Sequence, residues 1–185
     1  MITPIAKNYK GLISITGPTK SGKSQLAEFL IKEHESVTYI ATSKPRPNDP
    51  DWQRRIDIHR NRRPINWTLV ENPIDICKVI NTIRRKESIL IDSLGGLVEN
   101  HLIDNEIQWR IFQDKLLNSL TENQSCILVV SEEVGWGIVP ATPIGHLFRE
   151  RHSTLISLIS RQSKKRWLAI NGTAIDLDKF GELIP

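Results

Sequence analysis

Long apolar runs are absent from this chain of 185 residues. The longest hold about five residues, such as "CILVV" before Ser131, whereas a membrane-spanning helix needs roughly 20. We therefore expect no membrane span. The first ten residues, "MITPIAKNYK", contain no apolar stretch typical of a secretory signal. We interpret residues 1–10 as a short N-terminal arm and residues 11–185 as a single domain.

Cysteine is also scarce. Cys77 and Cys126 both lie inside apolar patterns, which predicts two buried free thiols in a reducing compartment, and hence a cytoplasmic protein. The spacing of cysteine and histidine matches no metal-binding pattern, so a zinc site is not expected.

Acidic residues are slightly fewer than basic residues, and the formal net charge is +4. Basic residues gather in the stretch 54–64, which contains five arginines and His59, "RRIDIHRNRRP". Three interpretations stay open for it: handling of nucleotide phosphates, a solvated helix face, or nucleic-acid binding. No recognised nucleic-acid motif accompanies the stretch, so we expect no nucleic-acid partner. Surrounding arginines disfavour a charged imidazole, which predicts a neutral, nucleophilic His59 near pH 7.

Strand-like and helix-like patterns alternate along the chain. Apolar runs predict strands at 12–16, 37–42, 67–71, 89–92, 127–131 and 166–170, and residues spaced three and four apart predict helices between most of them. This alternation predicts an α/β fold with a mainly parallel sheet flanked by helices. Such sheets bind ligands at the carboxyl ends of their strands.

The strongest motif is "GPTKSGKS", which follows the first predicted strand and opens a helix. It matches the phosphate-binding loop pattern in full. Gly17 and Gly22 allow the backbone to wrap around phosphate oxygens. Lys23 supplies positive charge to the β- and γ-phosphates, and Ser24 offers a hydroxyl to Mg²⁺. The sequence thus predicts a nucleotide-binding protein.

Carboxylates end two later strands. Asp92 follows the strand at 89–92, and a carboxylate there can hold Mg²⁺ beside the phosphate loop or simply cap the next turn. Glu132 and Glu133 follow the strand at 127–131 and lead into a glycine-spaced stretch ending at Pro140. We interpret this stretch as an active-site loop, in which the residues alone assign Glu133 no particular role.

Several of these segments together resemble one family, the bifunctional adenosylcobinamide kinase / adenosylcobinamide-phosphate guanylyltransferases of cobalamin biosynthesis. The resemblance covers roughly residues 11–178. Its most specific pieces are "RIDIHRNRRPINW" and "EVGWGIVP". It implies a RecA-like P-loop fold and a homo-oligomer, usually a trimer. It also implies phosphorylation of the aminopropanol hydroxyl of adenosylcobinamide by ATP or GTP, followed by GMP transfer from GTP through a covalent histidine.

The resemblance also implies roles for individual residues. It places the guanylylated histidine at His59. It places the phosphate loop at Gly17, Pro18, Thr19, Lys20, Ser21, Gly22, Lys23 and Ser24, nucleotide contacts at Thr42, Ser43 and Lys44, further GTP contacts at Arg60, Asn61, Arg62, Arg63 and Glu71, and the acidic strand-end residue at Asp92. Lys23 shares the catalytic role with His59, and Ser24 and Asp92 are the expected Mg²⁺ ligands.

The chain departs from the family pattern at three places. Pro18 stands where a second glycine is usual, and it lacks a backbone N–H. Glu132 stands where asparagine is usual. In the late helix, Ser153, Thr154, Ile156 and Ser157 replace a Gly-Arg-x-Asn-Gln pattern. Two alternatives therefore remain beside the bifunctional transferase: a relative that keeps only one activity, and a P-loop ATPase that binds nucleic acid.

Overall fold

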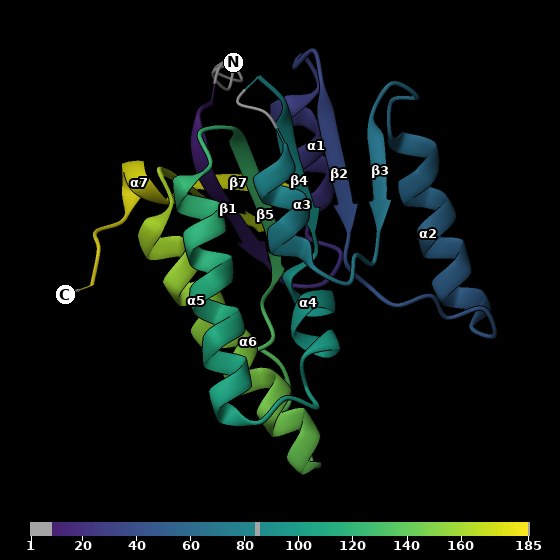
Figure 1. Ribbon diagram of the computed structural model, residues 1–185, viewed down its shortest axis with the longest axis vertical. Coiled ribbons are helices and arrows are strands. Elements are labelled where there is room, and N and C mark those ends of the chain that lie inside the picture. Colours follow the sequence, from purple (N-terminus) through teal and green to yellow (C-terminus); the bar gives the residue numbers. More distant parts are fainter. Residues whose placement is uncertain (1–8, 84–85, 185) are drawn as a thin grey trace.

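A seven-stranded sheet forms the centre of the computed structural model, which describes residues 9–83 and 86–184 (Figure 1). The strands lie in the order β3-β2-β4-β5-β1-β6-β7. All neighbours are parallel except β6 and β7, which are antiparallel. The strands are β1 (Gly11–Gly17), β2 (Val37–Ala41), β3 (Thr68–Glu71), β4 (Ser88–Asp92), β5 (Cys126–Glu132), β6 (Lys165–Ile170) and β7 (Thr173–Asp176). The predicted α/β fold with a mainly parallel sheet is confirmed.

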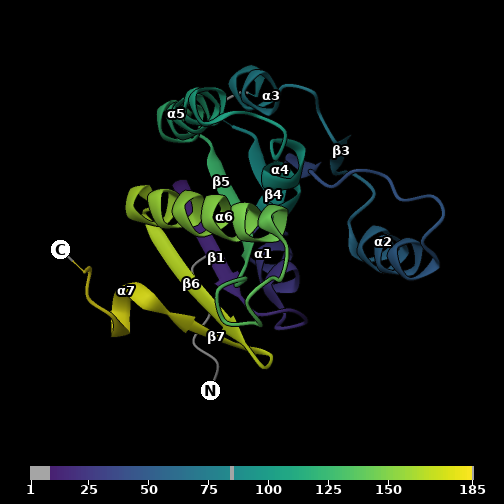
Figure 2. The same ribbon diagram turned by 90° about the horizontal axis from the view of Figure 1, so that it is seen from below.

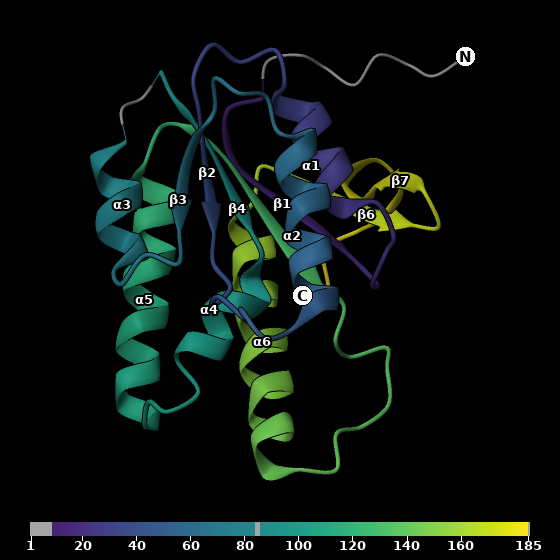
Figure 3. The ribbon, with the colours of Figure 1, turned by 90° about the vertical axis from the view of Figure 1, so that its right-hand side faces the viewer.

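Helices cover the sheet unequally. Seen from below, α3, α4, α5 and α6 lie on one face of the sheet and α1 on the other (Figure 2). The long helices α5 and α6 extend beyond the carboxyl ends of the strands (Figure 3). Helix α2 lies beyond β3, at the edge of the sheet (Figure 1). The helices are α1 (Lys23–Ile31), α2 (Pro50–Arg62), α3 (Ile76–Thr82), α4 (Leu94–Asn100), α5 (Glu106–Glu122), α6 (Pro143–Gln162) and the short α7 (Leu177–Phe180).

Two apolar clusters hold these layers together. Alternate side chains of the central strands point to opposite faces. Ile89 and Ile91 therefore pack with helices α3 to α6, whereas Leu90 packs with α1. Cys77 is buried in the larger cluster and Cys126 in the smaller one, and both are free thiols, as the sequence predicts.

Three elements were not expected from the sequence: strand β7 and the short helices α4 and α7. Strand β7 hairpins back from β6 through Asn171 and Gly172, which both have positive φ. Helix α4 has only seven residues and begins with Leu94, Gly95 and Gly96, and glycine lowers intrinsic helix propensity. Tertiary contacts of its buried residues therefore stabilise α4. Helix α3 begins at Ile76, where Asp75 caps it.

Helix α2 differs from every other long helix in having no buried residue. Asp49 caps it by accepting from the Trp52 backbone N–H at 2.9 Å, and Pro50 occupies its first turn. Most of the basic stretch singled out in the sequence lies on this helix. Across residues 9–83 and 86–184, no helix is both long and apolar enough to cross a bilayer.

Candidate active site

The phosphate-loop sequence lies between β1 and α1, at the carboxyl edge of the sheet. Gly17 has φ of 153°, and a Cβ there would lie 2.0 Å from the Ala169 carbonyl oxygen of β6. Gly22 caps α1 with φ of 98°, a left-handed conformation that favours glycine. The two glycines of the motif are therefore required by the fold as well as by the expected ligand.

Lys23 lies folded over this loop. Its ammonium donates to the Pro18 carbonyl at 2.7 Å, and only 8% of the residue is exposed. Burial lowers the pKa of Lys23, and the nearby carboxylates of Glu132, Asp92 and Glu133 oppose that shift. A phosphate oxygen in the loop would compete with the Pro18 carbonyl for the same ammonium.

The other loop residues differ in accessibility. Thr19 and Lys20 are exposed, and Ser24 is half-buried in the first turn of α1. Ser21 is buried, and its hydroxyl has no hydrogen-bond partner in the described part of the chain. Its backbone carbonyl accepts from Gly172 of the β6–β7 hairpin at 3.2 Å, so this hairpin supports the loop.

Asp92 ends β4, and its carboxylate is the meeting point of the site. Its side chain is 10% exposed. Tyr39 of β2 donates its hydroxyl to Asp92 Oδ2 at 2.7 Å, and Nδ1 of His59 lies 3.7 Å from the same oxygen. Because the charge of Asp92 also acts on Lys23, the structure brings the strand-end acid, the loop lysine and the candidate nucleophile together.

His59 reaches Asp92 from α2. Burial is the main reason that the pKa of His59 lies below its usual value; Asp92 opposes the shift, and Arg62, Arg55 and Arg63 add to it. The predicted direction of the pKa shift is thus supported, although burial rather than the arginines is its main cause. No hydrogen bond or ion pair of Nε2 occurs among the described residues, so this nitrogen is available to a ligand.

Arg62 connects α2 to the rest of the molecule. It donates to both carboxylate oxygens of Glu28 on α1, at 3.1 and 3.2 Å. Its Nη2 also lies 3.3 Å from His59 Nδ1. Burial raises the pKa of Glu28, and the bonds from Arg62 oppose that rise. Since α2 buries no side chain of its own, this bidentate pair is a principal anchor of the helix that carries His59.

The basic stretch divides into an inward and an outward side. Arg63 lies over the Tyr39 ring at 4.5 Å and has one buried, unpaired guanidinium nitrogen. Arg60 is exposed and pairs with Asp57 at 3.3 Å, and Arg54 pairs with Asp51 at 3.2 Å. Asn61 is exposed as well. The structure therefore brings Arg62 and Arg63, but not Arg60 and Asn61, toward the candidate site.

Residues that follow the second strand have different surroundings. Thr42 is buried, and its hydroxyl donates to the Ser93 carbonyl and accepts from the Ser93 N–H. Ser43 is half-buried and Lys44 is exposed. Glu71 is exposed at the end of the edge strand β3. Thr42 is thus engaged in supporting the strand ends, while Ser43 and Lys44 remain open to a ligand.

A network of polar side chains crosses the carboxyl edge of the sheet and includes Thr42. Asn100 of α4 donates to the Thr42 carbonyl at 3.1 Å and to the side chain of Asn72, which follows β3, at 2.8 Å. Gly96 permits the contact of α4 with β2, because a Cβ there would lie 2.4 Å from Thr42 Oγ1.

Glu132 extends this network toward α6. Its carboxylate accepts from the Ser93 hydroxyl and from the Gly95 N–H at 3.1 Å, and lies 3.4 Å from His152 Nε2. Burial opposes ionisation of Glu132, but the bonds from His152 and Ser93 outweigh it and lower its pKa. The carboxylate that replaces the usual asparagine therefore stays ionised beside the phosphate loop, and hydrogen bonds stabilise its charge.

Sequence reasoning missed several residues of this site. Each of four such residues contacts a partner that lies 20 to 58 positions away in the sequence: Glu28, Tyr39, Asn100 and His152. A polar residue inside an apolar strand, such as Tyr39 in "VTYIA", was the one available signal. The others look like ordinary helix-surface residues until the helices are placed.

Similarity to known proteins places the chain in a family. The sequence pattern of CobU, described as cobinamide kinase / cobinamide phosphate guanyltransferase, matches residues 13–177. The chain belongs to this family. It is 28% identical to the bifunctional adenosylcobalamin biosynthesis protein CobU of Escherichia coli K12, over 90% of this chain and 99% of that protein. It is 30% identical to CobP of Pseudomonas aeruginosa, over 88% and 95%. Membership of the CobU family makes the protein a transferase and confirms the resemblance read from the motifs.

Solved structures agree on the fold. A Pyrococcus horikoshii OT3 protein superposes with a TM-score of 0.52 at 8% identity, covering 95% of this chain and 91% of that one. An ATPase of a bacterial type III secretion system gives 0.53 at 9% identity, covering 94% and 59%. At such low identity these likenesses show the fold alone, and they agree with the expected α/β fold.

Proposed function

We propose that this protein phosphorylates the aminopropanol hydroxyl of adenosylcobinamide with ATP or GTP and then transfers GMP from GTP to the product through His59. The observation that carries the proposal is the approach of His59 to Asp92 beside the phosphate loop. A P-loop alone implies nucleotide binding. A half-buried histidine at the same strand edge adds a nucleophile.

The nucleotide phosphates would lie in the loop 17–24, where backbone N–H groups, Lys23 and the start of α1 favour negative charge. Half-buried Ser24 and the Asp92 carboxylate present oxygens, the atoms that Mg²⁺ prefers. Oδ1 of Asp92 has no partner in the described residues, so these residues fit the ion. When bound, Mg²⁺ would neutralise charge on the phosphates.

The guanylyl step begins with a neutral His59. Nε2 forms a bond to the α-phosphorus of GTP, the bond from that phosphorus to the bridging oxygen breaks, and pyrophosphate leaves. The modified imidazole carries positive charge, which the Asp92 carboxylate 3.7 Å from Nδ1 stabilises. A phosphate oxygen of adenosylcobinamide phosphate then attacks the same phosphorus and releases His59, giving adenosylcobinamide-GDP.

Arg62 and Arg63 supply the electrostatic part of this step. Guanidinium groups near the α-phosphate stabilise charge on its oxygens in the transition state. Arg63 has an unpaired buried nitrogen beside Tyr39, a donor that a phosphate oxygen could satisfy. Since Arg54 and Arg60 are paired with acidic neighbours on α2, the geometry favours this role over nucleic-acid binding.

We further propose that the protein works in the cytoplasm as a homo-oligomer, a trimer by the family resemblance. The two free thiols suit a reducing compartment. Sedimentation velocity tests the trimer directly.

The whole proposal is tested by product analysis. Purified protein is incubated with adenosylcobinamide, Mg²⁺ and either ATP or GTP. The corrinoids are then separated and identified by mass spectrometry. The expected products are adenosylcobinamide phosphate with either nucleotide that serves as donor, and adenosylcobinamide-GDP when GTP is present. Formation of adenosylcobinamide phosphate alone would show that the guanylyltransferase activity is missing. Guanylylation of supplied adenosylcobinamide phosphate alone would show that the kinase activity is missing. Neither product would show that both are missing.

A further inference from the structure

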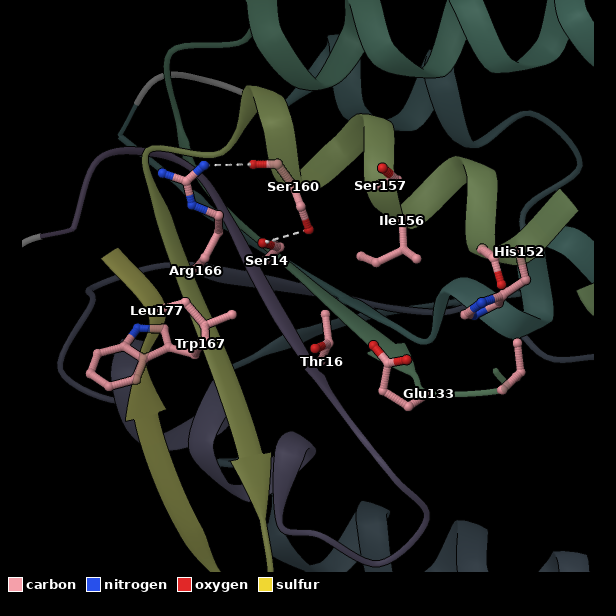
Figure 4. A pocket seen from close by; sticks show the side chains of 12 residues that line it. Ser14, Thr16, Glu133, His152, Ile156, Ser157, Ser160, Arg166, Trp167 and Leu177 are labelled. Atoms are coloured by element: carbon pink, nitrogen blue, oxygen red, sulfur yellow. Dashed lines mark hydrogen bonds between the residues drawn. The ribbon is translucent and has the colours of Figure 1, made fainter. Parts of the chain in front are cut away.

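A cavity of about 270 Å³ opens between α6 and the strands β1 and β6 (Figure 4). Hydroxyl groups dominate its polar lining: Ser14, Thr16, Ser153, Ser157 and Ser160. At one end Ser160 and Arg166 face each other, and at the other end lie Glu133 and His152 (Figure 4). Val134, Ile156, Trp167 and Leu177 add an apolar part to the lining. The cavity is therefore elongated and of mixed character, and it belongs to neither the phosphate loop nor the His59 side of the site.

One end of this cavity adjoins the phosphate loop. Thr16 lines it and directly precedes Gly17. Glu133 also lines it, and its N–H donates to the Gly17 carbonyl at 2.9 Å. The negative charge of Glu133 is among those that act on Lys23. A group bound at this end would lie next to the start of the loop that holds the phosphates.

Glu133 differs sharply from the residue before it. Glu132 has three hydrogen-bonding or charged partners on α4 and α6. The Glu133 carboxylate has none among residues 9–83 and 86–184, and it points into the cavity beside Thr16 (Figure 4). An unpaired, half-buried carboxylate is a strong hydrogen-bond acceptor, and it suits an O–H or N–H donor.

The opposite end of the cavity carries no free charge. The Arg166 guanidinium pairs with Asp178 and donates to the Ser160 carbonyl at 3.4 Å. The Ser160 hydroxyl in turn donates to Ser14 at 3.3 Å. With its one cation neutralised and a carboxylate at the other end, the cavity disfavours a phosphate. It suits an uncharged chain that bears hydroxyl and amide groups.

We propose that this cavity binds the hydroxyl-bearing arm of the corrinoid during the kinase reaction, with Glu133 as the general base. The proposal rests on the proposed function and adds a site and a catalytic residue to it. The arm's O–H donates to Glu133, which takes the proton as the oxygen bonds to the γ-phosphorus. The bond from that phosphorus to the bridging oxygen breaks, and the nucleoside diphosphate leaves.

Replacing Glu133 separates the two half-reactions. Glu133→Gln keeps the shape and removes the base. The rate of adenosylcobinamide phosphorylation, with ATP and GTP in turn, should fall about 100-fold or more, in the range of lost general-base catalysis. Formation of the GMP–protein adduct from GTP alone needs no corrinoid, and it should stay within about twofold of wild type. Glu150→Gln, an exposed carboxylate on α6, is the matched charge control and should change neither rate.

Filling the cavity tests the binding part. Ser157→Leu places a larger side chain in the lining, so KM for adenosylcobinamide should rise about tenfold, with adduct formation unchanged. Thr154→Leu, exposed on the same helix and outside the cavity, is the control and should leave KM unchanged.

Other outcomes overturn the inference. A Glu133→Gln protein that phosphorylates adenosylcobinamide at the wild-type rate would show that Glu133 is not the general base. Loss of both half-reactions in a folded Glu133→Gln protein would assign Glu133 to nucleotide binding instead. A wild-type KM for adenosylcobinamide in the Ser157→Leu protein would show that the arm binds outside this cavity. Wild-type protein that phosphorylates no corrinoid would overturn the kinase assignment itself, a result distinct from all of these.

Discussion

Nδ1 of His59 lies 3.7 Å from Oδ2 of Asp92, which joins a helix without any buried residue to the end of the central strand β4. This distance exceeds a hydrogen bond but lies within ion-pair range. Asp92 can therefore stabilise a positively charged imidazole while burial keeps the free imidazole neutral. Both effects serve a histidine that must attack as a neutral group and then carry GMP.

The anchor of α2 gives the first prediction. Glu28→Gln keeps the side-chain shape but removes the charge that holds Arg62. We expect adduct formation to slow about tenfold, which corresponds to about 1.4 kcal/mol, because His59 is positioned through this helix. The kinase rate should stay at wild type, since the phosphate loop does not depend on the pair. Rapid-quench measurement of GMP labelling at saturating GTP checks the first rate.

Glu33→Gln is the control for that experiment. Glu33 is exposed, and its pairing with Lys32 at 3.8 Å is a surface contact, which contributes little. An undiminished labelling rate in Glu28→Gln, or equal loss of both activities, would contradict the anchoring role.

The titration of His59 gives the second prediction. Its pKa is lowered from 6.5, mainly by burial, so NMR of the nucleotide-free protein should show a midpoint below 6.5. Neutral His59 thus stabilises the fold above pH 6.5, and this contribution is lost as the pH falls through the lowered pKa. Arg55→Gln removes a nearby positive charge and should raise the midpoint. The His59→Ala spectrum assigns the signal, and a wild-type midpoint above 6.5 would disprove the shift.

The third prediction concerns the close approach of α4 to β2. Gly96→Ala would place a Cβ 2.4 Å from Thr42 Oγ1 and 2.7 Å from the Ser43 nitrogen. We expect the free energy of unfolding to fall by about 1–3 kcal/mol, the usual cost of overpacking. Urea denaturation measures it. Gly137→Ala, where a Cβ would meet nothing within 4 Å, should leave stability unchanged, and equal effects of the two changes would refute the explanation.

Much of the fold could be predicted from local patterns. Apolar runs mark the central strands β1, β2, β4 and β5, because both faces of these strands are buried. Glycines at fixed spacing mark the phosphate loop. Strand β7 and helix α4 carry no such signal. Their residues are ordered by partners elsewhere, as Gly95 is by Glu132 and Gly96 by Thr42.

The site was predictable only in part for the same reason. The motif resemblance pointed to His59 and Asp92, and the structure brings the two together. It could not separate Arg62, which faces Glu28, from Arg60, which faces solvent, because a helix without an apolar face shows no periodicity that would orient it. The pairing of Glu132, a departure from the family pattern, with His152 joins two residues that are distant in sequence.

The central claim is that His59 carries GMP, and peptide mapping of labelled protein tests it most directly. The protein is incubated with Mg²⁺ and GTP labelled at the α-phosphate, denatured and digested. We predict an acid-labile, base-stable label on the peptide that contains His59, and none in His59→Ala protein that still binds GTP. A folded, GTP-binding wild-type protein without label, or with label on another residue, would contradict the account.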